Sequence, residues 1–267
     1  MGSLTRTQRQ RAVRLTLYAL FVLLAVAFVL VADWEAISSS FFLVEGFTGT
    51  WQDFVFVGAR NTILYTIIAF VGGFVLAMVL VLMKLAPVAP FRWLATVYIE
   101  LFRGLPALVV ILFMALGVPI AFGWRPPGGT IGAGLVGLML VAAAYMAETI
   151  RAGIEAVPKG QTEAARSLGM SGPWTMATVV MPQALRIVIP PLTNELVILI
   201  KDTSLLFVVG MAANEKELTT MARDFMASGP SAGTATSLVF ACLMYLAITL
   251  PLTRVVAWLE RRQKRSR

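Results

Sequence analysis

Four polar side chains lie in an apolar stretch around residue 200, and their types and spacing make them the first candidates for chemistry. Glu195 and Asp202 are seven residues apart, as are Asn194 and Lys201, so a helix would place each pair on one stripe. Ionisable groups within a membrane span are costly, and they usually face a wet cavity or one another. Carboxylates and an ammonium in such a cavity could bind a zwitterion, whose two charges must be stripped of water. We therefore expect these residues to line a polar path or a subunit interface, with a purely structural ion cluster as the alternative.

Two closer pairs of opposite charges occur in other apolar stretches. Glu100 and Arg103 are three residues apart, as are Glu148 and Arg151, so each pair can neutralise itself on one helix face. A structural role and a functional role stay equally open for both pairs. We include Glu100 and Arg103 among the candidate path residues.

Catalytic and metal chemistry find little support in the sequence. The chain has no histidine and a single cysteine, Cys242, which excludes a disulfide framework and a His/Cys metal site. No paired catalytic constellation stands out, so a membrane enzyme ranks low. The Gly-x-x-x-x-Gly-Lys-Ser/Thr phosphate loop does not occur in the chain. We expect neither a catalytic site nor a cofactor, and any ATP that drives this protein must be handled by a partner.

Composition places these residues in a membrane protein. Of 267 residues, 58% are hydrophobic and 13% are charged, whereas an ordinary soluble domain carries about 25% charged residues. The net charge of +8 does not indicate nucleic acid, because the basic residues cluster at the ends of apolar runs. A span requires roughly 20 apolar residues, so we predict an all-α integral membrane protein with about six transmembrane helices. The expected spans are 16–32, 55–83, 91–118, 131–149, 191–210 and 234–256.

Two of these spans have distinctive features. The first follows four arginines, which is also the layout of a signal peptide with Ala25-Val26-Ala27 as its cleavage site. We favour a retained anchor, because the apolar run continues to about the length that a spanning helix requires. In the third span, Pro106 should kink the helix.

The distribution of Lys and Arg predicts the orientation, because cytoplasmic segments retain these residues. With the N-terminus inside, the outer loops keep only Arg125, Lys216 and Arg223, with Arg60 near the outer edge of the second span. Both basic termini are then cytoplasmic. The outer segment 211–233 has apolar residues at helical spacing, for which a helix lying on the membrane surface and packing on neighbouring helices remain equally open.

Segment 151–190 is too polar to span a membrane and too long for a turn, so we expect a folded cytoplasmic projection. Pro158 is placed to start a helix, and Gly169 is placed to end it. Ser171 can cap a second short helix, which Pro182 should stop. The predicted structure is a helix, a sharp turn and a helix.

The same segment carries a motif whose paired alanines offer a flat face to a groove on another protein. The motif is Glu163-Ala164-Ala165, three residues, Gly169, nine residues and Val179-Val180-Met181-Pro182. It resembles the EAA motif in the cytoplasmic loop of ABC importer permease subunits, whose last four residues are Ile-x-Leu-Pro, so Val179 and Met181 are apolar departures. An incidental amphipathic loop is the alternative. The resemblance implies that a partner ATPase docks on Glu163, Ala164, Ala165, Gly169 and Pro182.

Further segments look like the polar amino acid branch of these permeases, namely 98–106, 144–154, 182–186 and 201–205. The resemblance runs from about Gly58 to Glu260. It implies an importer of polar amino acids in the cytoplasmic membrane. The partners would be two ATPase subunits, a second identical or different permease, and an extracytoplasmic binding protein.

This resemblance sets the expected domains. They are 1–54 with the first helix and an outer loop, a permease domain 55–260 that contains the coupling loop 151–190, and a basic tail 261–267. A secondary transporter is the main rival, because midplane charges and broken helices also suit that class. It gives no reason for the Glu-Ala-Ala segment.

Overall fold

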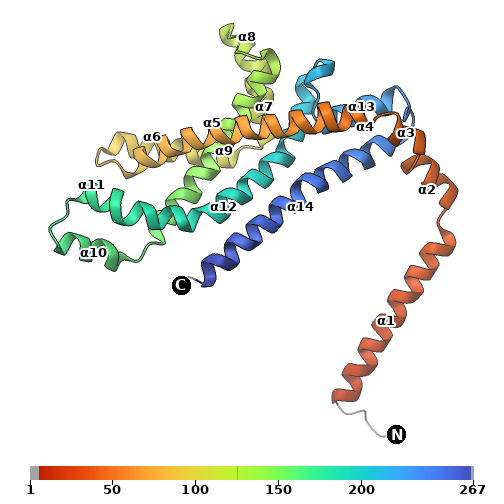
Figure 1. The fold of residues 1–267 in the computed structure, drawn as a ribbon, viewed down its shortest axis with the longest axis horizontal. Helices are drawn as coiled ribbons and strands as arrows, with labels where there is room; N and C mark the ends of the chain where they lie inside the picture. Colours follow the sequence, from red (N-terminus) through yellow and green to blue (C-terminus); the bar gives the residue numbers. More distant parts are fainter. Residues whose placement is uncertain (1–5, 125, 266–267) are drawn as a thin grey trace.

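The structure is a computed structural model that describes residues 6–124 and 126–265. Arg125 and the last two residues of the predicted 261–267 tail lie outside the described residues. The described residues form helices joined by short connections, with no strand among them, as the predicted all-α class requires. Figure 1 shows their arrangement. The first elements are α1 (Arg6–Val31), α2 (Trp34–Phe41), α3 (Val44–Thr48), α4 (Trp51–Asp53), the π-helical η1 (Phe54–Ala59) and α5 (Arg60–Leu85).

The central elements carry the predicted third and fourth spans and the coupling loop. They are α6 (Ala89–Gly104), α7 (Ala107–Leu112), η2 (Phe113–Gly117), α8 (Val118–Phe122), α9 (Gly129–Glu155), α10 (Lys159–Ser167) and α11 (Gly172–Thr175). The remainder are η3 (Met176–Val180), α12 (Met181–Asp202), η4 (Thr203–Val209), η5 (Ala213–Glu215), α13 (Leu218–Ala227) and α14 (Thr236–Arg265).

Four helical stretches among the described residues are long and apolar enough to cross a membrane, and the count rises to five if the bent α6–α8 pair is one span. The four are Arg6–Val31, Trp51–Leu85, Gly129–Glu155 and Thr236–Gln263. The remaining predicted span corresponds to α12, which carries charges near both ends and is not among these candidates. Several membrane-spanning helices are therefore established, and the count of six stays a prediction.

The expected kink at Pro106 is a complete break. Ala89–Gly104 and Ala107–Phe122 meet at 107°. Leu105 has φ −94° and ψ 141°, and Pro106 has φ −60° and ψ 129°, so two successive extended residues end the helix. The residue before a proline is disfavoured in the helical region, and this explains why a break replaces a kink.

The prediction that Pro182 stops the second helix of the loop is wrong. The chain passes from α11 through the π-helical η3 directly into α12, and Pro182 lies in the first turn of α12. Val180 before α12 has helical backbone angles, φ −78° and ψ −50°, so no loop separates the two segments. The span predicted from Pro191 begins within α12, since Pro190 and Pro191 lie inside that helix.

The core is built around α9, which packs against α5, α6, α7 and α12. Gly153 permits a close approach to α12, because a Cβ at that position would lie 2.0 Å from Val188 Cγ1. By contrast, α1 has no buried residue and stands apart from the other helices in Figure 1. Its apolar side chains are therefore free to contact lipid or another protein.

The outer segment forms a second, smaller cluster. Leu218, Met221 and Ala222 of α13 are buried against Phe54 of η1 and Ala241 of α14. Of the two expectations for this segment, packing on neighbouring helices is therefore confirmed.

Candidate functional site

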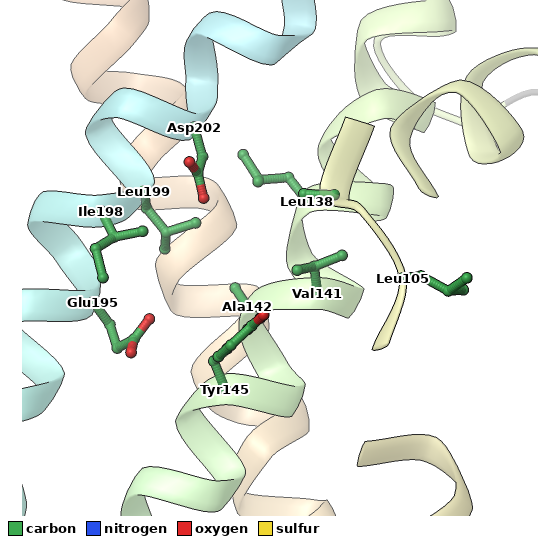
Figure 2. A pocket seen from close by; sticks show the side chains of 10 residues that line it. Leu105, Leu138, Val141, Ala142, Tyr145, Glu195, Ile198, Leu199 and Asp202 are labelled. Atoms are coloured by element: carbon green, nitrogen blue, oxygen red, sulfur yellow. The ribbon is translucent and has the colours of Figure 1, made fainter. Parts of the chain in front are cut away.

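A cavity of about 270 Å³ lies between α9, α12 and the break that separates α6 from α7. Its wall is mostly apolar, and Figure 2 shows how the side chains of α9 and α12 meet across it. The lining residues are Leu105, Ala107, Leu138, Val141, Ala142, Tyr145, Glu195, Ile198, Leu199 and Asp202.

Glu195 and Asp202 supply the two carboxylates of this cavity. Both side chains are partly buried and lie on the side of α12 that faces α9 (Figure 2). The prediction from their seven-residue spacing, that they share one helical stripe, is confirmed. Tyr145 adds a phenolic hydroxyl from the α9 wall.

Asn194 and Lys201 do not belong to this cavity. Both are exposed, and Lys201 lines a separate groove of about 470 Å³ with Ser204, Thr219 and Tyr245 among its neighbours. Successive residues of an α-helix point about 100° apart, so Lys201 turns away from the cavity that Asp202 faces. Lys201 therefore does not line the cavity that Asp202 faces, and its role in the substrate path stays a prediction.

Glu148 is the centre of a charge cluster near the same wall. Its carboxylate lies 2.5 Å from Arg151 Nη2, which confirms the predicted pair on α9. Lys84 Nζ from the end of α5 lies 3.7 Å away, and Arg103 Nη1 from the end of α6 lies 4.0 Å away. Three helices thus direct cations at one carboxylate.

The predicted pairing of Arg103 with Glu100 is wrong. Arg103 turns to Glu148 instead, and its guanidinium carbon lies 5.8 Å from the centre of the Tyr145 ring. Glu100 is exposed on α6, and within the described residues it has no ion pair shorter than 4.0 Å. Arg103 therefore lies over the ring of Tyr145, which lines the cavity, and neither Arg103 nor Glu100 is a lining residue.

The predicted helix at Pro158 and its end at Gly169 are confirmed by α10, whose N-cap is Pro158. Gly169 has φ +84°, a left-handed conformation that suits glycine. The Gly169 N–H donates to the Arg166 carbonyl at 3.0 Å, and the Met170 N–H donates to the Ala165 carbonyl at 3.2 Å. These two bonds form a Schellman motif, which fixes the sharp turn. Ser171 is the N-cap residue of α11 but makes no capping hydrogen bond through its side chain.

The two alanines of the motif face in different directions. Glu163 and Ala164 are exposed, but Ala165 is only 5% exposed, so the expected flat face of paired alanines is not formed. The exposed large apolar residues between the start of α10 and the end of η3 are instead Leu168 and Trp174, which are 83% and 61% exposed. Neither residue is among the coupling residues predicted from the sequence. The sequence contains a signal for their exposure, because both are apolar residues within a polar segment, where no apolar neighbours cover them.

Pro182 is exposed where α12 begins. The next residue, Gln183, donates a hydrogen bond to the side-chain oxygen of Gln161 on α10 at 3.3 Å. This contact holds the two arms of the loop together. Glu163, Ala164, Ala165 and Gly169 therefore belong to one projection between α9 and α12, and Pro182 lies where this projection meets α12.

A buried carboxylate in the outer segment was also missed. Glu217 is 0% exposed and accepts hydrogen bonds from the N–H groups of Thr219 and Thr220, both at 2.6 Å. The Tyr245 hydroxyl of α14 donates to it at 2.9 Å. Burial raises the pKa of the Glu217 carboxyl. Its position just before α13 was the sequence signal, because acidic groups suit a helix N-terminus.

Comparison with known proteins places this geometry in a family. Residues 73–265 match the family described as "Binding-protein-dependent transport system inner membrane component". The probable glutamine ABC transporter permease of Bacillus subtilis (strain 168) is 38% identical over 209 residues, which cover 78% of this chain and 93% of the relative. The arginine transport system permease of the same organism is 32% identical over 211 residues, which cover 79% and 93%.

A further relative and a solved structure support the same family. The glutamate/aspartate import permease of Escherichia coli O157:H7 is 32% identical over 211 residues, covering 77% of this chain and 91% of the relative. A crystal structure described as an amino acid ABC transporter with histidines superposes with a TM-score of 0.72 at 33% identity, covering 80% of this chain and 96% of that one. An inward-facing MetNI methionine ABC transporter, at 19% identity and a TM-score of 0.59, shares the fold. The predicted resemblance is confirmed, and the chain belongs to the family of inner membrane components of binding-protein-dependent transport systems.

Proposed function

We propose that this chain is the permease subunit of an ATP-driven importer that moves polar amino acids across the cytoplasmic membrane. The observation that carries the proposal is a direct connection between two parts of the fold. The exposed projection α10–α11–η3 joins the C-terminal end of α9 to the N-terminal end of α12, and these are the two helices that wall the cavity. A partner that displaces the projection therefore acts on both cavity walls.

The projection has the properties of a docking element. Its Schellman turn at Gly169 fixes the angle between α10 and α11, and Leu168 and Trp174 expose apolar surface. We assign Glu163, Ala164, Gly169 and Pro182 to contact with the ATPase subunit. Ala165 supports the projection from within, because it is buried.

The cavity is assigned to the substrate path through Glu195 and Asp202. Arg103 lies over the ring of Tyr145, a lining residue. Asn194, Lys201 and Glu100 are exposed charges or amides of membrane-region helices. Because such groups avoid lipid, we assign them to surfaces that a second permease copy or a water-filled path covers.

The complete importer has two permeases, identical or different, two ATPase subunits and an extracytoplasmic binding protein. The family description supports the binding protein, and the exposed polar groups support the second permease. Both termini and the projection are cytoplasmic, as the Lys and Arg distribution indicates. The permease domain extends over 55–260, with 1–54 as an extension and 261–267 as a basic tail.

Transport in reconstituted vesicles tests the proposal. The permease, its ATPase and its binding protein are assembled in lipid vesicles, and uptake of radiolabelled amino acids is measured with ATP available to the ATPase. We expect uptake that requires ATP and the binding protein. Uptake that persists without ATP, and that a proton or sodium gradient drives instead, would establish a secondary transporter and refute the proposal.

A further inference from the structure

The first turns of α1 carry four arginines, and three of them line one open hollow. The hollow measures about 430 Å³, and its lining residues are Arg6, Arg9, Gln10, Val13 and Arg14. Successive residues of an α-helix point about 100° apart, so these five fall within an arc of roughly 140°. The fourth arginine, Arg11, lies outside that arc and does not line the hollow. Three guanidinium groups are thus presented on one face of the helix.

No acidic group among the described residues neutralises these arginines. All four are exposed, and the ion pairs of the described residues lie elsewhere in the chain. The first acidic residue of the sequence is Asp33, beyond the far end of α1. A guanidinium group binds phosphate oxygens through two parallel N–H groups. The hollow therefore favours an anionic occupant that comes from outside the chain.

The apolar part of α1 places the hollow at the level of lipid headgroups. This helix is one of the stretches long and apolar enough to cross a membrane. Its apolar run begins at Leu15, directly after Arg14, and rises about 26 Å to Val31, close to the thickness of a hydrocarbon core. At the other end, the half-exposed Trp34 donates its indole N–H to the Val29 carbonyl at 2.8 Å, as suits an aromatic residue at the opposite interface. The arginines thus lie where the phosphate groups of one leaflet are found.

An apolar stripe runs from the hollow along α1. Val13 lines the hollow, and Leu17, Leu20 and Leu24 follow at intervals of four, three and four residues, which keep them on the same face. All four side chains are at least half exposed. No other described helix covers this stripe, since α1 has no buried residue and stands apart in Figure 1. A lipid acyl chain fits along it, whereas a free phosphate or an acidic peptide has no group that requires such a surface.

We propose that this face of α1 binds an anionic phospholipid, whose phosphate contacts Arg6, Arg9 and Arg14 and whose acyl chain follows the apolar stripe. Basic residues immediately next to a membrane span attract anionic lipids, and the hollow turns that attraction into a defined site. The site lies outside residues 73–265, which match the family, and it does not depend on the substrate that the chain transports. The lipid supplies the packing that α1 lacks within the described chain.

Native mass spectrometry tests the proposal, because it resolves the lipids bound to a protein one at a time. The full-length permease, alone and with its ATPase, is titrated with phosphatidylglycerol and with phosphatidylcholine of the same acyl chains. We expect the tightest site to prefer phosphatidylglycerol at least fivefold. Equal affinity for the two lipids would overturn the proposal, and so would a permease mass that shows α1 to have been removed.

Single arginine variants localise the site, with Arg11 as the matched control. One arginine close to an anionic membrane surface is worth about fivefold in affinity. Arg9→Gln and Arg14→Gln should therefore each weaken phosphatidylglycerol binding about fivefold and leave phosphatidylcholine binding unchanged. Arg11→Gln removes the same charge from the same helix but should change either affinity less than twofold. All three positions are exposed, so the fold should be kept. Equal losses in Arg9→Gln and Arg11→Gln would show attraction by net charge alone and refute a defined site.

Two further measurements identify the occupant. Glycerophosphoglycerol carries the lipid headgroup without acyl chains, so it should not displace phosphatidylglycerol at equal concentration. Effective displacement would reveal a phosphate site that uses no acyl chain and would overturn the lipid assignment. Co-purification of the ATPase with Arg9→Gln should equal that of the wild type. A loss of ATPase with unchanged lipid binding would show that an acidic surface of the ATPase is the occupant, and the proposal would be wrong.

Discussion

Arg103 Nη1 lies 4.0 Å from Glu148 Oε1, so the last turn of α6 is tied to α9 beside the cavity between α9 and α12. The same carboxylate meets Lys84 and Arg151. Glu148→Gln keeps the shape of the side chain but leaves three cations without their shared anion. Because charged hydrogen bonds are lost, we expect a destabilisation on the order of 1–3 kcal/mol, measured by thermal unfolding of the detergent-solubilised protein.

Glu155 provides the control for that variant. It pairs with Arg151 alone and its side chain is 63% exposed. Glu155→Gln should cost about 0.5 kcal/mol or less, as exposed ion pairs usually contribute little. Equal melting temperatures for the wild type and Glu148→Gln would show that the cluster has no stabilising role.

Bulk at Ala164 should interfere with ATPase docking. Ala164 is exposed on α10, so Ala164→Trp leaves the chain's own packing intact but overfills a groove on a partner. We expect normal membrane insertion and a loss of ATPase co-purification of fivefold or more. Ala164→Ser, which adds little volume, should behave like the wild type. Wild-type assembly of the Trp variant would remove Ala164 from the interface. Ala165→Trp is a poor test, because Ala165 is buried.

Sequence reasoning succeeded where the relevant forces are local. Pro158 and Gly169 predicted both ends of α10, because proline suits a helix start and glycine adopts the left-handed conformation of a helix end. The spacing of Glu195 and Asp202 predicted a shared face, because helical periodicity alone determines it.

Prediction from the sequence failed where a helix far away in the sequence determines the contacts of a side chain. Arg103 has Glu100 one turn away on its own helix, but the fold brings Glu148 of α9 within its reach. Whether Lys201 faces the cavity depends on which helices cover each side of α12, and periodicity does not contain that information. Pro190 and Pro191 lie inside α12, although the predicted coupling loop ends and the predicted span begins there, because helices in membranes tolerate proline when neighbouring groups satisfy the freed carbonyls.

The stability of the outer segment should depend on pH through Glu217. Burial holds the pKa of this carboxyl above its usual value, so the folded protein binds the proton more tightly than the unfolded chain. Stability from this group therefore rises as pH falls through the folded pKa, and the rise ends near the unfolded pKa of about 4.3. Thermal unfolding at pH 7.5 and pH 5.5 measures the change.

Glu217→Gln isolates this contribution. The amide cannot titrate, and one of its ends would place a donor against the N–H groups of Thr219 or Thr220, so the variant should also be less stable at both pH values. Between pH 7.5 and 5.5, the wild type should gain stability relative to the variant. A relative loss on acidification would contradict the assignment.

The proposed orientation can be tested with single cysteines after Cys242 has been replaced. Ser171 lies in the exposed projection, and Thr130 is exposed at the opposite end of α9. With an impermeant thiol reagent in intact cells, we expect Thr130→Cys to be labelled and Ser171→Cys to be labelled only after the membrane is opened. The reverse pattern would invert the topology.

The close approach of α9 and α12 at Gly153 leads to a prediction about the cavity itself. A Cβ at residue 153 would lie 2.0 Å from Val188 Cγ1, too close for any packing without movement. Gly153→Ala should therefore force apart the two helices that wall the cavity and cost roughly 1–3 kcal/mol. Thermal unfolding reports the loss of stability, and amino acid uptake per assembled complex reports the change in the cavity.

A second substitution tests whether the contact with Val188 is the cause. Val188→Ala removes the methyl group that the new Cβ would meet, whereas the next atoms, Val188 Cβ and Ala184 O, are 3.4 Å and 3.5 Å from it. The double variant should be more stable than the sum of the single effects predicts, since adjacent sites that share one steric conflict are not additive. Additive losses would show that the two side chains do not compete for this space, and wild-type stability of Gly153→Ala alone would show that the helices are not held at this distance.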